Sequence, residues 1–216
     1  MKKGAKTLVQ CDFDGTVTEE DVSYIILDAF AGGDWKKLTS DYEESKITVG
    51  RFNSAAFSMV KAGKESLLER VNKEATIRPG FGELVAFCRR SDIRFVIVSN
   101  GLQFYIEDIL KNIGMTDIEV HAAETQFSGD GLKVQYVGPS GNYLDNDFKV
   151  AYLNSFLNQG YRVIYVGNGS SDVSPAARSH HIFATGTLLK RCREAGLECT
   201  PFSDHNDIVS ILESWQ

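Results

Sequence analysis

The stretch that decides the fold is TLVQCDFDGT, which runs from Thr7 to Thr16. Its first half is a short, largely apolar run typical of a buried strand in a parallel sheet, and it leads directly into acidic and turn-forming residues. Asp12 and Asp14 are separated by one residue, and in an extended backbone alternate side chains point to the same face. The two carboxylates therefore share one side of the chain, either as turn formers or as paired functional groups.

Strand and helix patterns alternate along most of the chain. Residues 94–98 and 162–166 are the strongest further strands, and residues 118–121 and 181–183 are weaker candidates. Alternation of this kind predicts an α/β fold with a doubly wound, mainly parallel sheet and a Rossmann-like core. Residues 124–136 depart from it, and their SGDG centre predicts a hairpin turn. The helical patterns lie at residues 81–90, 102–113, 148–159, 173–180 and 188–195.

A long segment after the first strand contains helical patterns only. It is far longer than the dozen or so residues that a crossover between parallel strands needs. We therefore predict a helical cap at residues 19–79, inserted into an α/β core formed by residues 1–18 and 80–216, with its return point at 78–80. The helices of this cap are expected at 22–31, 34–40, 49–62 and 65–75, with N-caps at Asp34 and Thr48 and a C-terminal stop at Gly63.

The composition is that of a soluble globular protein with ample material for a core. The 216 residues are 43% hydrophobic, and 23 basic against 29 acidic side chains give a net charge of −6. This acidity argues against a nucleic-acid partner. No apolar run approaches the roughly 18–20 residues that span a bilayer, and the basic opening lacks the apolar stretch of a signal peptide, so no membrane partner is expected.

Cysteine usage favours the cytoplasm. The four cysteines show no CxxC spacing and lie mostly within apolar segments, a pattern typical of reduced, buried thiols. They are Cys11, Cys88, Cys192 and Cys199.

Small or polar residues follow three of the strands at the point where each ends. They are DFDGT at 12–16, SNG at 99–101 and GNGSSD at 167–172. Ligands of open α/β sheets bind at the carboxyl ends of the strands, so these segments are expected to meet. Each also has a simpler interpretation: turn-forming aspartates, a plain helix start, or a dinucleotide-binding loop without its third glycine. The coincidence of three such ends favours a shared site.

Lys149 is informative on physical grounds alone. It falls in the first turn of a helix expected to begin near Asp147, where the helix dipole disfavours a cation. Either a bound anion removes this conflict, or the lysine is solvated and paired with Asp145 or Asp147. Together with the three strand ends, the pattern favours a bound anion.

The DFDGT segment at 12–16 resembles the DxDxT motif of the haloacid dehalogenase superfamily of phosphatases. The other motifs of that superfamily follow in the expected order, at Ser99, Lys149 and residues 167–172. The resemblance covers essentially the whole chain, and the helical insertion is similar to the cap of the phosphoserine phosphatase-like branch. It implies a phosphomonoesterase.

The resemblance also implies a role for each motif residue. Asp12 is the implied nucleophile and forms an aspartyl-phosphate, while Asp14 protonates the leaving alcohol and then takes a proton from water. Ser99, Asn100 and Lys149 are implied to bind the phosphate.

A bound Mg²⁺ is the implied cofactor. Its implied ligands are Asp12, Asp14 through the backbone carbonyl, Asn168 and Asp172. Asn168 departs from the family, which usually has aspartate at that position, so the site has one negative charge fewer.

The substrate is expected to be a small phosphorylated metabolite. Residues 183–202 are similar to the tail of the methionine-salvage 2-hydroxy-3-keto-5-methylthiopentenyl-1-phosphate phosphatases, although residues 136–149 lack the cysteine cluster that those enzymes often carry. Phosphoserine phosphatases use a cap arginine, and Arg51 falls about a helical turn too early to match it. The alternatives are a phosphoserine phosphatase, a catalytically weak phosphate-binding protein and, more remotely, a dinucleotide-binding oxidoreductase.

Overall fold

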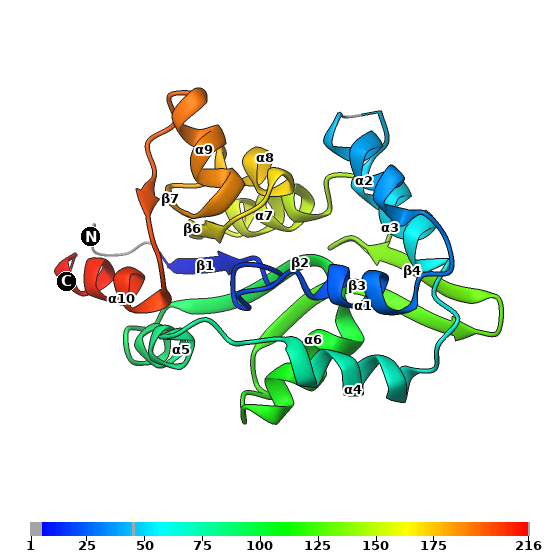
Figure 1. Ribbon diagram of the computed structural model, residues 1–216. Coiled ribbons are helices and arrows are strands. Elements are labelled where there is room, and N and C mark those ends of the chain that lie inside the picture. Colours follow the sequence, from blue (N-terminus) through cyan, green and yellow to red (C-terminus); the bar gives the residue numbers. More distant parts are fainter. Residues whose placement is uncertain (1–5, 45, 216) are drawn as a thin grey trace.

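The structure is a computed structural model that describes residues 6–44 and 46–215, and an eight-stranded sheet forms its centre (Figure 1). The strand order is β5-β4-β3-β2-β1-β6-β7-β8. The sheet is parallel except for β4 and β5, which extend it as an antiparallel edge beyond β3. The predicted α/β class with a mainly parallel, doubly wound sheet is confirmed. The strands are β1 (Thr7–Cys11), β2 (Arg94–Leu102), β3 (Glu119–Ser128), β4 (Gly131–Val137), β5 (Tyr143–Leu144), β6 (Arg162–Gly167), β7 (His181–Ala184) and β8 (Thr200–Pro201).

β1 lies at the centre of the sheet. All five of its residues are buried, as expected for a strand that is covered on both faces. The chain leaves β1 to build β2 and β3 on one side, and it returns later to build β6, β7 and β8 on the other. This reversal of strand order opens a crevice at the carboxyl ends of β1 and β6, where ligands bind in such sheets.

Helices cover both faces of the sheet (Figure 1). One face carries α5 (Phe81–Arg90), α6 (Gln103–Asn112) and α10 (His205–Ser214), and the other carries α7 (Phe148–Asn158), α8 (Val173–Ala176) and α9 (Gly186–Glu194). Within the described residues, no helix is long and apolar enough to cross a membrane.

Two parts of this arrangement differ from the sequence pattern. α8 is shorter than the helix predicted at 173–180, because the amide of His180 bonds to the carbonyl of Val163 and thereby joins the sheet. A 3₁₀ turn, η1 (Ser170–Asp172), precedes α8. The short strands β5 and β8 and the helix α10 are additional elements.

Four helices follow the first-motif loop: α1 (Val22–Phe30), α2 (Trp35–Glu43), α3 (Val49–Phe57) and α4 (Lys64–Glu74). The predicted N-caps of α2 and α3 are confirmed, because the side chains of Asp34 and Thr48 each accept a hydrogen bond from an amide three residues ahead.

The prediction that Gly63 stops a helix is wrong. Gly63 is the N-cap residue of α4, and α3 already ends at Phe57. The chain leaves the helix there because Val60 pairs with Ala31 in an antiparallel bridge, which residues in helical conformation cannot form.

The four-helix segment leaves and rejoins the sheet region at one place. Thr18 pairs with Ile77 in an antiparallel bridge. The guanidinium group of Arg78 then donates hydrogen bonds to the carbonyl oxygens of Gly15 (2.9 Å) and Thr16 (3.0 Å). These bonds tie the first-motif loop to the expected return point. The division into a cap at 19–79 and a core stays a prediction.

α3 packs against the antiparallel edge of the sheet with almost no space at one position. A β-carbon at Gly50 would lie 2.3 Å from the carbonyl oxygen of Asp145, just after β5. Gly82 in α5 offers a contrast, because a β-carbon there would meet only the terminal methyl of Met115, at 3.4 Å. The first neighbour is backbone, and the second is the flexible end of a side chain.

We predict opposite effects of alanine at these two helical glycines. Gly50→Ala should lower the free energy of unfolding by about 1–3 kcal/mol, because α3 must move away from the Asp145 backbone. Gly82→Ala should leave it unchanged or raise it by up to about 1 kcal/mol, through the better helix propensity of alanine. Urea denaturation of both variants measures the difference. Equal stability of the two would mean that α3 does not dock at this distance.

Candidate active site

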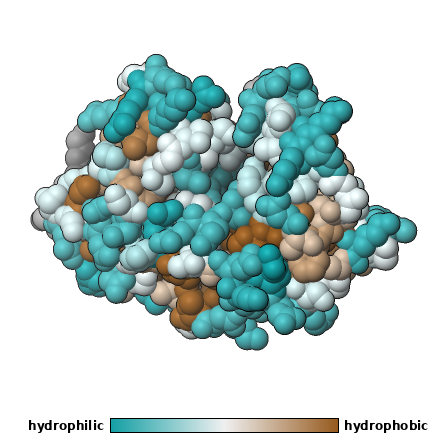
Figure 2. Space-filling model, viewed as in Figure 1, coloured by the Kyte–Doolittle hydropathy of each residue, from teal (hydrophilic) through white to brown (hydrophobic). Residues whose placement is uncertain are grey.

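A cavity of about 360 Å³ opens at the carboxyl ends of β1, β2 and β6. Figure 2 shows the molecular surface hollowed between the side of α9 and the side of α2 and α3, with polar residues on both rims. Six of the seven residues proposed from sequence line this cavity, and Asp172 does not. The six are Asp12, Asp14, Ser99, Asn100, Lys149 and Asn168.

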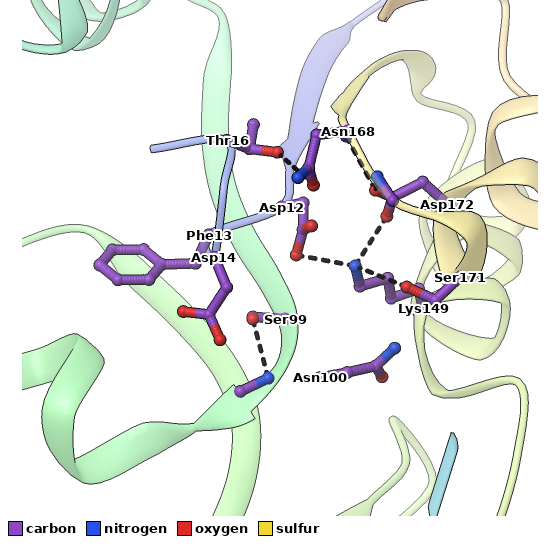
Figure 3. A network of polar contacts seen from close by, with 12 residues as sticks. Asp12, Phe13, Asp14, Thr16, Ser99, Asn100, Lys149, Asn168, Ser171 and Asp172 are labelled. Carbon is purple, nitrogen blue, oxygen red and sulfur yellow. Dashed lines mark hydrogen bonds and ion pairs between the residues drawn. The ribbon is translucent and has the colours of Figure 1, made fainter. Parts of the chain in front are cut away.

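Lys149 lies between two carboxylates at the floor of this cavity (Figure 3). Its Nζ is 2.7 Å from Oδ1 of Asp12 and 2.7 Å from Oδ1 of Asp172, and it donates a longer bond of 3.3 Å to Oγ of Ser171. Only 3% of the lysine is exposed. This placement excludes the solvated lysine that was the simpler interpretation of the sequence.

The same ion pairs resolve the conflict between Lys149 and the helix dipole. Lys149 is the second residue of α7, whose N-cap Asp147 adopts a left-handed conformation with φ of 59°. The dipole at this end carries a partial positive charge that disfavours a cation. Asp12 and Asp172 supply compensating negative charge from β1 and η1, so the lysine is stable there without a bound anion.

Asp172 is fully enclosed behind Lys149. Its Oδ1 accepts hydrogen bonds from Lys149 and from the hydroxyl of Tyr165 at 2.6 Å. Its Oδ2 accepts from the backbone amides of Asn168 (3.0 Å) and Gly169 (2.8 Å). The sequence led us to expect that Asp172 binds the metal directly. Its carboxylate is fully buried and already accepts hydrogen bonds from four donors, which leaves no room for a metal ion.

The two carboxylates beside Lys149 differ in their acidity. Burial opposes ionisation of Asp172, but Lys149, Tyr165 and the backbone amides outweigh it and hold its pKa below the ordinary value. Burial and the neighbouring charge of Asp172 raise the pKa of Asp12 to about 7, despite Lys149. Burial also opposes the charge of Lys149, yet both aspartates keep its pKa above the ordinary value. Asp172 is therefore the carboxylate that stays ionised beside Lys149, whereas the ionisation of Asp12 depends on the charges near it.

Asp14 lies on the other side of the first-motif loop, without a cation in hydrogen-bond contact. Its Oδ2 accepts hydrogen bonds from the hydroxyls of Tyr105 (2.5 Å) and Ser23 (2.9 Å). Its buried Oδ1 has no hydrogen-bond partner within the described structure. Burial, and secondarily the charge of Asp21, raise the pKa of Asp14 to about 7. A carboxyl group in this range is suited to both giving and taking a proton near neutral pH.

Ser99 and Asn100 belong to the end of β2, which extends to Leu102 and passes through the segment expected to be a helix start. Oγ of Ser99 accepts a hydrogen bond of 3.0 Å from the amide of Gly101. The carbonyl oxygen of Asn100 accepts hydrogen bonds from Tyr136 of β4 and Asn53 of α3. The backbone at this edge of the cavity is thus fixed from both sides.

Comparisons with known proteins agree with this geometry. Residues 9–177 match the family model of the haloacid dehalogenase-like hydrolases. The chain is a haloacid dehalogenase-like hydrolase. The resemblance to this family that was inferred from the motifs is confirmed.

Several relatives of the hydrolase carry one name. The 2-hydroxy-3-keto-5-methylthiopentenyl-1-phosphate phosphatase of Brevibacillus brevis is 27% identical, over 98% of this chain and 97% of its own. A protein of the same name from Geobacillus kaustophilus is 28% identical over 94% of each chain. The bifunctional enzyme MtnB/MtnX of Bacillus licheniformis is 30% identical over 96% of this chain, which spans 49% of that longer protein.

Solved phosphoserine phosphatases share the fold of the hydrolase. A phospho-aspartyl intermediate analogue of phosphoserine phosphatase superposes with a TM-score of 0.72 at 19% identity, over 96% of this chain and 99% of that one. A substrate-bound phosphoserine phosphatase gives a TM-score of 0.71 at 18% identity, over 97% and 99% of the two chains.

The donors at the cavity floor fit the Mg²⁺ ion that this family implies. Within residues 6–44 and 46–215, no three histidine, cysteine or acidic side chains cluster as a metal site. Mg²⁺ prefers oxygen ligands, usually needs only one or two carboxylates, and retains several waters. The carboxylate of Asp12, the carbonyl oxygen of Asp14 and Oδ1 of Asn168 are all oxygen donors. Asn168 is already oriented, because its Oδ1 accepts a hydrogen bond of 3.1 Å from the hydroxyl of Thr16.

Sequence reasoning missed the residues that support these groups. Tyr165 contacts Asp172, and Ser23 and Tyr105 contact Asp14. One signal was available: a tyrosine inside an otherwise apolar strand or helix face needs a partner for its hydroxyl when it is buried. That signal identifies Tyr165 and Tyr105 as candidates, but it does not identify their partners.

The raised pKa of Asp14 predicts a pH-dependent gain in stability when its charge is removed. Between pH 4 and 7 the folded hydrolase binds more protons at Asp14 than the unfolded chain does, so this group lowers stability progressively as pH rises. Asp14→Asn should therefore raise the free energy of unfolding by about 1–3 kcal/mol at pH 8, and by much less at pH 4. Urea denaturation in EDTA at both pH values measures the change.

Asp172→Asn is the matched control, because its effect has the opposite sign. The lowered pKa of Asp172 contributes stability that is present above the pKa of an unfolded aspartate and is lost as pH falls through the folded value. This variant should be destabilised most at pH 8. A destabilised Asp14→Asn variant at pH 8 would contradict the assignment of Asp14.

Proposed function

We propose that this hydrolase is a Mg²⁺-dependent phosphomonoesterase that works through an aspartyl-phosphate at Asp12. The observation that carries the proposal is the position of Lys149, a buried cation 2.7 Å from Asp12 on the cavity floor. A phosphate dianion and a carboxylate nucleophile repel each other, and a fixed cation beside both lowers that repulsion. Asp172 holds the cation in place from behind.

The first half-reaction follows from the two carboxylates of the first motif. A carboxylate oxygen of Asp12 attacks phosphorus while the ester P–O bond breaks, and the leaving oxygen takes a proton from Asp14. Lys149, the Ser99 hydroxyl and amides of the two loops bind the phosphoryl oxygens, with Asn100 at the cavity edge. In the second half, Asp14 takes a proton from water, which attacks phosphorus and releases Asp12.

The proposed metal site consists of Asp12, the carbonyl oxygen of Asp14 and the side chain of Asn168. When bound there, Mg²⁺ supplies positive charge that stabilises the transferring phosphoryl group. Asp172 supports the site indirectly, because its Oδ2 binds the amides of Asn168 and Gly169 and so shapes that loop.

The substrate that we propose is 2-hydroxy-3-keto-5-methylthiopentenyl-1-phosphate, named for the relatives above. Apart from its phosphate, this molecule carries no charged group. Among the cavity-lining residues that the structure describes, Lys149 is the one lysine or arginine. The side of the cavity formed by α1–α3 instead presents aromatic and apolar side chains, with acidic groups between them: Tyr24, Tyr42, Val49, Phe52, Asp21 and Glu43.

Phosphoserine fits this lining poorly. Its carboxylate would face Asp21 or Glu43, and none of the described residues by which the helical segment lines this cavity is a lysine or arginine. Arg51, the one arginine of α3, points elsewhere: its side chain is 73% exposed and lies 3.9 Å from Asp145, outside the cavity. The substrate class therefore differs from that of the fold relatives.

The same proposal places the enzyme in the cytoplasm, where it would act on a free metabolite. Its four cysteines support this placement, because all are unpaired thiols and three of them are buried.

Steady-state kinetics on paired substrates tests the proposal. With Mg²⁺, the wild-type protein should hydrolyse the enol-phosphate with a kcat/KM at least about 100-fold above that for phosphoserine, since a carboxylate without a cationic partner is costly to bind. Asp12→Asn should abolish turnover of both, because an amide is a poor nucleophile toward phosphorus. Equal use of phosphoserine would refute the substrate, and an active Asp12→Asn variant would refute the mechanism.

Asn168→Asp tests the metal site. A carboxylate has nearly the shape of the amide and adds one negative charge, which should lower the Mg²⁺ concentration for half-maximal rate by about 3- to 30-fold after solvent screening. Asn146→Asp adds the same charge at an exposed position three residues before Lys149, and it should shift that concentration much less. A Mg²⁺ titration with saturating substrate compares the variants. If Asn168→Asp behaves like Asn146→Asp, Asn168 is not a ligand.

A further inference from the structure

Two hydroxyl groups and one carboxylate oxygen form a closed triangle beside the cavity. Oδ2 of Asp14 lies 2.5 Å from the hydroxyl of Tyr105 and 2.9 Å from Oγ of Ser23, and the two hydroxyls are 2.9 Å apart. Tyr105 is fully buried and Ser23 is 7% exposed. Neither residue belongs to the motifs that define the active site, and neither has a role in the mechanism above.

The triangle is built from segments that lie far apart in the sequence. Ser23 is in the first turn of α1, within the four-helix segment, and Tyr105 is in the first turn of α6, which follows β2. Gly101 makes room for the contact: a β-carbon there would lie 2.1 Å from the Tyr105 hydroxyl and 2.8 Å from Oδ2 of Asp14. Asp14 is therefore bound from two sides, by Ser23 of the four-helix segment and by Tyr105 of α6.

Counting protons shows what the triangle does to Asp14. Each hydroxyl has one proton, and both groups can donate to Oδ2, which is then occupied as an acceptor. Oδ1 is buried and has no partner in the described structure, while Asp14 as a residue lines the cavity. An acidic proton on Oδ1 leaves both bonds to Oδ2 intact, whereas a proton on Oδ2 would have to displace a donor.

We infer that Tyr105 and Ser23 are positioning residues that bind Oδ2 of Asp14 and hold its carboxyl group in one orientation for proton transfer in the cavity that this residue lines. The inference rests on the proposed phosphatase function. As the ester P–O bond breaks, its electron pair stays on the leaving oxygen, which takes the proton of the Asp14 carboxyl group. The resulting carboxylate is held by the two hydroxyls at Oδ2. In the second half-reaction the Asp14 carboxylate receives the proton of the attacking water.

Leaving-group dependence isolates this role from a merely structural one. 4-Nitrophenyl phosphate and benzyl phosphate are similar in size, but only the benzyl ester has a basic leaving oxygen that needs protonation. Tyr105→Phe and Ser23→Ala should each lower kcat for benzyl phosphate by about 5- to 30-fold, a part of the 100- to 10,000-fold that general acids contribute. The kcat for 4-nitrophenyl phosphate should fall by less than about 3-fold, with KM unchanged for both esters.

Two controls keep the result interpretable. Tyr152→Phe removes a comparable hydroxyl bond, to the carbonyl oxygen of Val137 at 3.0 Å and away from the cavity, and it should leave both rates unchanged. In the Asp14→Asn background, Tyr105→Phe should cause no further loss with benzyl phosphate, because its effect acts through Asp14. If Tyr105→Phe does not fold, Ser23→Ala alone decides the matter.

The outcomes separate this inference from the function on which it rests. Equal loss with both esters, or no loss with either, would overturn the positioning role while the phosphatase assignment stands. A wild-type protein that hydrolyses neither ester nor the enol-phosphate would overturn the phosphatase assignment itself.

Discussion

The rest of the site depends on one buried cation held between two carboxylates. Removing an ammonium group from water costs several kcal/mol, and only close, well-oriented partners offset that cost. Asp12 follows β1, Asp172 ends η1 after β6, and Lys149 lies in the first turn of α7. The ion pairs therefore fix the relative positions of three elements that meet at the reversal of strand order, which is also where the cavity opens.

Three aspartates of the same intrinsic acidity differ in the groups that surround their carboxylates. Asp172 has four hydrogen-bond donors and remains a permanent anion. Asp12 shares Lys149 with it and faces the cavity, so an approaching phosphoryl group or metal ion changes its surroundings most. Asp14 has hydroxyl partners but no contacting cation, which keeps a proton available. Placement alone thus gives three identical side chains different surroundings, which suits them to the different roles proposed above.

Much of the fold and of the cavity floor was predictable, because periodicity and strand-end residues are local signals. The buried run 7–11, the carboxylates after it and the odd position of Lys149 each point to the same edge of the sheet. The supporting contacts were not predictable. Tyr105 meets Asp14 across 91 residues of sequence, and Tyr136 meets Asn100 across 36, so only the assembled topology reveals them. The surroundings of Asp172 were only partly predictable, since two of its four donors, Lys149 and Tyr165, lie outside the motif at residues 167–172.

The most direct measurement of the central claim is the identity of the residue that carries the phosphoryl group. Wild-type protein is mixed with Mg²⁺ and 4-nitrophenyl phosphate, quenched during turnover, and reduced with borohydride, which converts an aspartyl-phosphate into homoserine. Peptide mass spectrometry should find homoserine at position 12 and at no other aspartate. Homoserine at another position, or continued turnover with no reduced residue at all, would contradict the assignment of Asp12 beside Lys149 as the nucleophile.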